Sequence, residues 1–126
     1  MLIVISPAKN LDFESPAKTK ITSQPAMLKE AKSLVDICKK FSAPELTDLM
    51  GISNKLAFLN AERFQEWSPP FNDENSKQAL LAFNGDVYSG LNATSFTESD
   101  LKFAQDHLRI LSGLYGILRP LDLMQA

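Results

Sequence analysis

The chain opens on an uninterrupted apolar run, MLIVI at Met1–Ile5, which ends at Ser6 and Pro7. A strand that is apolar at successive positions has no face suited to water, which is typical of a buried strand inside a parallel sheet. The pattern therefore predicts a buried central strand. ALLAF at 79–83 and LRILS at 108–112 predict two further strands, and for LRILS a continuation of the preceding helix is the alternative.

Helical periodicity dominates the region after the first polar loop, residues 12–25. From Ala26 to Phe41 the apolar residues recur every three or four positions, which predicts a helix with one buried stripe. Ser42, with Glu45 three residues later, forms a capping box for a short second helix. Gly51 is suited to end that helix in the left-handed conformation.

Two more helices follow from their capping residues. Ser53 can cap a third helix from Asn54 to about Glu66, and the apolar positions expected to be buried on it are Leu56, Leu59 and Phe64. The sequence Thr97-Glu-Ser-Asp100 opens a fourth helix that runs to about His107. Between them, NGDVYSGLNATS at 84–95 is expected to be a connection punctuated by glycines.

The order of strand, helices, strand, helix and strand predicts an α/β fold: a mixed, partly parallel sheet with flanking helices. The last residues, DLMQA, contain neither a helix cap nor a strand end, so we expect an incomplete domain.

Composition agrees with an ordinary globular protein of 126 residues, 44% hydrophobic and 22% charged. The longest apolar run is too short to cross a membrane and lacks the features of a signal peptide, so the expected location is the cytoplasm, without a membrane partner. Cys38 and His107 are the only residues of their types, so we expect no internal disulfide, metal site or cofactor, and Cys38 is expected to be a buried, inert thiol.

Net charge is −2, and its distribution is uneven. Residues 1–55 carry eight Lys and six Asp or Glu, a balance of +2, whereas residues 56–126 carry two Lys, three Arg and nine Asp or Glu, a balance of −4. Neither half has the charge of a strongly basic nucleic-acid binder, so any binding of nucleic acid must be local.

The stretch LMGISNKLA at 49–57 combines a glycine turn with an immediate helix start. It fits the helix-hairpin-helix pattern, in which the N–H groups of Gly51, Ile52 and Ser53 face a phosphate, Lys55 adds a charge and Ala57 allows close helix packing. The alternative is a plain corner with a glycine cap and a serine cap. Ser53 stands where a second glycine is usual, and from the motif alone the plain corner is favoured.

A second candidate site lies at the predicted strand exits, where open α/β sheets usually bind ligands. Its members share polar or cationic side chains near glycines or prolines: Ser6, Lys9, Asp86, Tyr88, Tyr115 and Arg119, with Asp122 close to the last of them. Turn chemistry also favours Asp beside Gly, and a solvated loop lysine is common.

Four blocks carry a resemblance to a known family: MLIVISPAKNLDF, ISNKLAFLNAERF, LAFNGDVYSGL and LRILSGLYGILRPLDLM. Together they resemble the bacterial peroxide stress protein YaaA family across the whole chain. Members are substantially longer, so the resemblance implies that residues 1–126 are the N-terminal part of a single YaaA-like domain, with the helix-hairpin-helix at about 44–66.

The resemblance implies a cytoplasmic protein of the peroxide stress response that limits unincorporated iron and binds double-stranded DNA. With it, the phosphate-facing interpretation of the corner leads. The implied DNA-binding positions are Gly51, Ile52, Ser53, Asn54 and Lys55, with Lys9, Arg63 and Arg119 as further cations. An enzyme or a binder of nucleotides or other anions at the strand exits is the alternative, although we expect no enzymatic activity and assign no catalytic residue.

Overall fold

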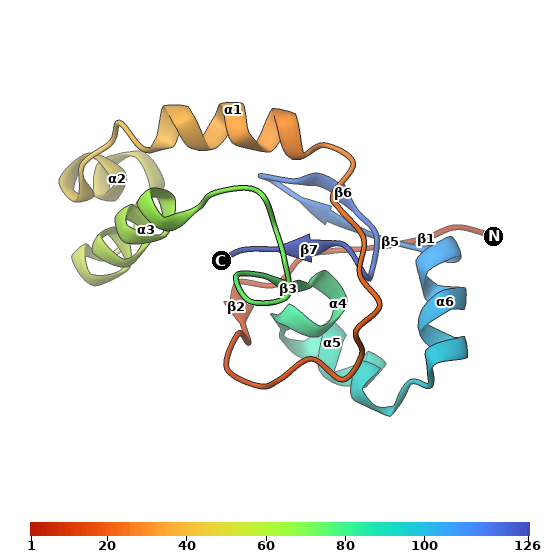
Figure 1. The fold of residues 1–126 in the computed structure, drawn as a ribbon. Helices are drawn as coiled ribbons and strands as arrows, with labels where there is room; N and C mark the ends of the chain where they lie inside the picture. The colour runs from red at the N-terminus through yellow and green to blue at the C-terminus, as the bar shows by residue number, and fades with distance from the viewer. The chain divides into compact units, whose positions relative to one another are not determined.

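The computed structural model describes residues 1–126, which form two compact units (Figure 1). Unit 1 comprises Met1–Leu28 and Pro70–Ala126, and unit 2 comprises Lys29–Pro69. None of the helices combines the length and the apolar character needed to cross a bilayer.

Unit 1 contains the sheets. Its strands are β1 (Ile3–Ile5), β2 (Asn10–Leu11), β3 (Lys77–Gln78), β4 (Phe83–Asn84), β5 (Leu108–Ser112), β6 (Gly116–Leu118) and β7 (Leu123–Met124). The main sheet has the order β1-β5-β6, with β1 parallel to β5 and β5 antiparallel to β6. Two antiparallel pairs, β2–β4 and β3–β7, complete the set. The mixed, partly parallel α/β fold is therefore confirmed.

The first strand forms as predicted, but it is neither central nor buried. β1 lies at the end of the three-stranded order, and the side chains of Ile3 and Val4 are 48% and 52% exposed. Only Ile5 is partly covered. The prediction failed because a run of apolar residues shows that a strand favours burial but does not show which segments lie beside it. Within these 126 residues β1 has a neighbouring strand on one side only.

The ALLAF segment is not a strand. Ala79–Ala82 forms a short helix, α4, and only Phe83 enters a strand. The Ala79 N–H donates to the carbonyl of Asp122 at 2.8 Å and the Leu80 N–H to that of Pro120 at 3.0 Å. These bonds tie the start of the segment to a distant part of the chain, and the backbone then closes into a single helical turn.

The predicted glycine-rich connection also contains helical structure. Asp86–Leu91 forms α5 and Ala93–Ser95 a 3₁₀ turn, joined by Asn92 in the left-handed conformation. The helix α6, Glu98–His107, begins with the predicted capping box of Thr97 and Asp100. β5 follows it directly, so the strand prediction for LRILS is confirmed and the continued helix is wrong.

Unit 2 holds the remaining helices. α1 spans Leu28–Cys38, shorter at both ends than predicted, and Cys38 is half-buried rather than buried. α2 spans Ala43–Met50 and α3 spans Asn54–Glu66, and the two pack against each other. Their predicted caps, Ser42 with Glu45 and then Ser53, are all present.

The predicted inward face of α3 is wrong. Leu56 and Leu59 are exposed and Phe64 is half-buried, whereas Ala57 is completely buried. Ala57 is thus the buried residue of α3, although three larger apolar side chains were expected to be. The apolar residues of α2 and α3 that stay exposed are Leu49, Met50, Leu56, Phe58 and Leu59.

Candidate functional site

The corner between α2 and α3 is built by two capping residues in succession. Gly51 has φ 63° and ψ 37°, a left-handed conformation that costs an L side chain energy and that glycine adopts freely. Its N–H donates to the carbonyl of Thr47 at 3.0 Å. Gly51 therefore shapes the corner while its own N–H is already used within the protein.

Ser53 starts the next helix. Its hydroxyl accepts from the Leu56 N–H at 3.2 Å, and its carbonyl accepts from the Ala57 N–H at 2.9 Å. Four consecutive N–H groups are left without a partner inside the protein: those of Ile52, Ser53, Asn54 and Lys55. All but Ile52 belong to exposed residues, so the corner presents an array of donors at the positive end of α3.

Charge around the corner is sparse. Lys55 is exposed in the first turn of α3. Arg63 lies eight residues further along the helix, roughly 12 Å away and about 80° around the axis at α-helical geometry. Glu62 and Glu66 fall closer to the face of Lys55 than Arg63 does, so an anion would be attracted at the corner and repelled further along α3.

Unit 2 as a whole is electrically neutral, with six basic and six acidic side chains. The basic ones are Lys29, Lys32, Lys39, Lys40, Lys55 and Arg63, and the acidic ones are Glu30, Asp36, Glu45, Asp48, Glu62 and Glu66. Long-range attraction to a polyanion is therefore weak, and contact with an anion depends on the local geometry of the corner.

The strand exits in unit 1 form a separate cavity of about 320 Å³. It is lined by Pro7, Ala8, Lys9, Asn10, Asn84, Gly85, Asp86, Val87 and Tyr88. Gly85 packs closely there, since a Cβ at this position would lie 3.2 Å from the Cβ of Ala8. The cavity thus brings Lys9 and Asp86, which are distant in sequence, to the same opening.

Tyr88 is one of the residues that line this cavity. Its hydroxyl donates to the carbonyl of Ser6 at 2.6 Å, and its ring stacks on Phe83 with centroids 5.4 Å apart. Burial raises the pKa of Tyr88 to about 12, so the phenol remains a hydrogen-bond donor at neutral pH. Ser6 contributes a backbone atom to this arrangement.

Comparison with known proteins identifies the family of this chain. The family model described as "Peroxide stress protein YaaA" matches residues 1–126. This chain belongs to the YaaA family. It is 59% identical over 126 residues to a UPF0246 protein of Colwellia psychrerythraea, and the match covers all of this chain and 49% of that protein. The chain thus spans about half the length of the curated relative that it matches.

Two strand-exit positions predicted for this YaaA-family chain lie outside the cavity. Tyr115 is buried, its hydroxyl exchanges hydrogen bonds with the backbone of Gln125 at 3.0 and 3.1 Å, and its ring meets Phe71 edge to face. Arg119 pairs with the carboxylate of Asp122 at 3.0 Å and donates to the carbonyl of Gln24 at 2.9 Å. The structure therefore brings together Ser6, Lys9, Asp86 and Tyr88 but neither Tyr115 nor Arg119.

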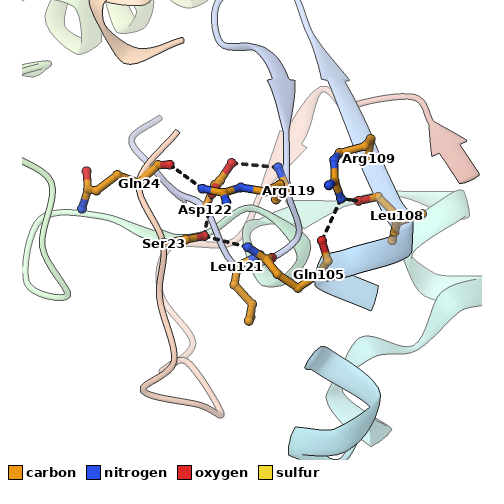
Figure 2. Close-up of polar contacts among 8 residues, drawn as sticks. All are labelled: Ser23, Gln24, Gln105, Leu108, Arg109, Arg119, Leu121 and Asp122. Atoms are coloured by element: carbon orange, nitrogen blue, oxygen red, sulfur yellow. Dashed lines mark hydrogen bonds and ion pairs between the residues drawn. The ribbon is translucent and has the colours of Figure 1, made fainter. Parts of the chain in front are cut away.

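The polar cluster around Asp122 was not anticipated from the sequence (Figure 2). Asp122 is completely buried and accepts from the Ser23 hydroxyl at 2.6 Å and from the Arg119 N–H at 2.8 Å. Gln105 donates to the Ser23 hydroxyl at 3.0 Å and accepts from the Leu121 N–H at 2.8 Å. The cluster joins the polar loop at residues 12–25, helix α6 and the segment between β6 and β7, and it occupies Arg119 with structural contacts.

Lys77 is a second buried polar residue that sequence reasoning missed. Its ammonium donates to the carbonyls of Asp12 and Ser15 at 2.9 and 2.8 Å and lies 3.8 Å from the Asp12 carboxylate. The N–H of Ser15, more than any other group, holds the pKa of Asp12 below its usual value. These contacts fix the polar loop on unit 1, and no local sequence pattern indicates them.

Proposed function

We propose that this protein binds the phosphate backbone of double-stranded DNA through the α2–α3 corner, without strong sequence specificity. It does so in the cytoplasm as part of the peroxide stress response, in which it helps to limit unincorporated iron. Membership of the YaaA family supports the stress role. The observation that carries the DNA-binding part is the run of four unpartnered N–H groups from Ile52 to Lys55.

A phosphate suits this corner for two physical reasons. Unpaired N–H groups at a helix N-terminus point outward, and the helix dipole places positive potential there. Lys55 adds a mobile positive charge in the same turn. Because phosphates are the same along every duplex, such contacts position a protein on DNA but do not read its sequence.

The same charges limit the affinity. Unit 2 is neutral and the chain carries a net charge of −2, so one corner with one lysine gives weak binding. We expect the log–log dependence of affinity on salt to be shallow, with a slope of roughly −1 for the single lysine contact. Lys9, Arg63 and Arg119 are further cations for DNA, and each has a carboxylate nearby that weakens its contribution.

The decisive test compares Lys55→Ala with Lys29→Ala, which removes an exposed lysine of α1 outside the corner. Fluorescence anisotropy with two unrelated duplexes is measured at several salt concentrations. Lys55→Ala is expected to weaken binding equally for both duplexes and to reduce the salt slope by roughly 1. Lys29→Ala is expected to change neither. If the two variants behave alike, the corner does not bind DNA.

The cavity at the strand exits supports a second candidate, binding of a small anionic ligand such as a nucleotide. Lys9 supplies a positive charge, and Asn10 and Asn84 supply amide donors and acceptors around the 320 Å³ space, while the Asp86 carboxylate in the same lining lowers the affinity for an anion. A saturable rise in melting temperature with nucleotide or inorganic phosphate, abolished by Lys9→Ala, is expected for such a site. If neither probe raises the melting temperature, this candidate is eliminated, and the DNA-binding proposal is unaffected.

A further inference from the structure

The free edge of β1 is unprotected. In the main sheet β1 pairs with β5 on one side only, so alternate residues of β1 direct their N–H and C=O groups away from the sheet. Exposed edges are normally protected by charges, prolines or bulges. The segment from Met1 to Ser6 contains no charged side chain and no proline. The carbonyls of Met1 and Ser6 contact His107 and Tyr88, so the part that is open to the addition of another strand is Ile3–Ile5.

The faces of β1 carry apolar side chains that are covered only at Ile5, which is half-buried beside its fully buried register partner Ile110. Leu2 is 61% exposed, in addition to Ile3 and Val4 at about half. On the Val4 face, the neighbouring strands expose Leu111 and Ile117, which are cross-strand partners. On the Ile3 face, an apolar groove of about 480 Å³ runs along α6 between Phe96, Phe103 and Leu108. Arg109, the register partner of Val4, lies between Val4 and the Leu111–Ile117 pair, so one charged side chain interrupts the exposed apolar residues on that face.

We propose that β1 is the docking site for an apolar β-strand from the half of the family-length polypeptide that this chain does not match. The Colwellia relative is about twice as long as this chain, and the match to it includes all of β1. The added strand pairs with the free edge of β1, and the residues around it cover the Val4 face and the groove beside Phe103. This would make β1 an interior strand of the longer protein.

A second copy of this chain fits the surface less well. Pairing of β1 with β1 of another copy extends the sheet but adds no layer over Val4, Leu111 and Ile117, which would stay exposed in both copies. A strand from the same polypeptide also acts at a high effective concentration and needs no association between molecules. The occupant is therefore assigned to the longer chain.

The test is hydrogen exchange of the β1 amides in this 126-residue chain and in the full-length Colwellia protein. We expect the outward-facing amides of β1 to exchange rapidly here and roughly a hundredfold more slowly, or slower still, in the longer protein. Equal exchange in the two proteins overturns the proposal. Protection that appears in this chain only as its concentration rises identifies a second copy as the occupant and also overturns it.

A substitution gives an independent readout. Val4→Lys is expected to change the melting temperature of this chain little, because the side chain is half exposed. The same change at the equivalent position of the Colwellia protein is expected to destabilise it strongly, because a lysine would be covered there. Val4→Thr, which keeps the β-branched shape, is the matched control and is expected to be far milder. A lysine tolerated equally in both proteins contradicts the assignment.

Discussion

Replacement of Asn54 by proline removes one N–H of the α2–α3 corner without disturbing the fold. Asn54 is the first residue of α3, where proline is favoured because the N–H has no partner in the helix. The preceding Ser53 has φ −65° and ψ 158°, a conformation compatible with a following proline. Asn54→Pro should therefore unfold at the same temperature as the parent or slightly above it.

The effect on DNA binding follows from the single lost donor. A hydrogen bond to a charged group contributes about 1.5–3 kcal/mol, and an exposed contact lies at the low end, so affinity should fall about tenfold. Because no cation is lost, the salt slope should stay unchanged, unlike that of Lys55→Ala. Anisotropy titrations at several salt concentrations measure both quantities.

The matched control is Asn54→Ala. It removes the same side chain, including its 3.4 Å contact with the Thr47 hydroxyl, but keeps the backbone N–H. We expect Asn54→Ala to bind DNA like the parent. If Asn54→Pro and Asn54→Ala bind with equal affinity, the N–H does not contact phosphate, and the argument from unpaired donors is refuted.

Two further predictions concern stability. Asp122→Ala should lower the free energy of unfolding by about 3 kcal/mol, because it leaves the Arg119 charge and the Ser23 hydroxyl without their buried partner. Asp36→Ala, which breaks an exposed pair with Lys32, is the control and should lower it by less than about 0.5 kcal/mol. Urea denaturation measures both. The parent should lose stability as pH rises from 10 towards 12, because the unfolded chain releases the Tyr88 proton at an ordinary pKa near 10 while the folded chain holds it to about 12. Tyr88→Phe should have a smaller alkaline loss in the same denaturation series, and an unchanged loss would contradict the role of Tyr88.

The features that could be predicted from the sequence are those fixed by neighbouring residues. The caps at Ser42, Ser53 and Thr97 each depend on a partner within three positions, and all three helices begin where expected. Gly51 ends α2 for a similarly local reason. The corner, as the junction of two such signals, could therefore be located from the sequence alone.

The features that could not be predicted depend on distant partners. Whether Ala79–Ala82 forms a strand or a turn of helix is decided by the backbone of Pro120 and Asp122. The position of β1 in the sheet depends on which segments lie beside it, which its own apolar residues do not specify. Likewise, Tyr88 and Tyr115 both lie near glycines in the sequence, but only Tyr88 lines the strand-exit cavity.

The division of unit 1 into two stretches of sequence has a consequence for synthesis on the ribosome. β1 cannot pair with β5 until Leu108–Ile110 has emerged, and the Ser23–Asp122 bond cannot form until Asp122 has. At roughly 5–20 residues per second, the apolar N-terminus spends several seconds without its partner strand. Unit 2 lies between the two stretches in the sequence, and contacts within residues 29–69 can form while unit 1 still lacks its partner strand. Chaperones that shield exposed apolar segments are therefore expected to bind Met1–Ile5 during synthesis.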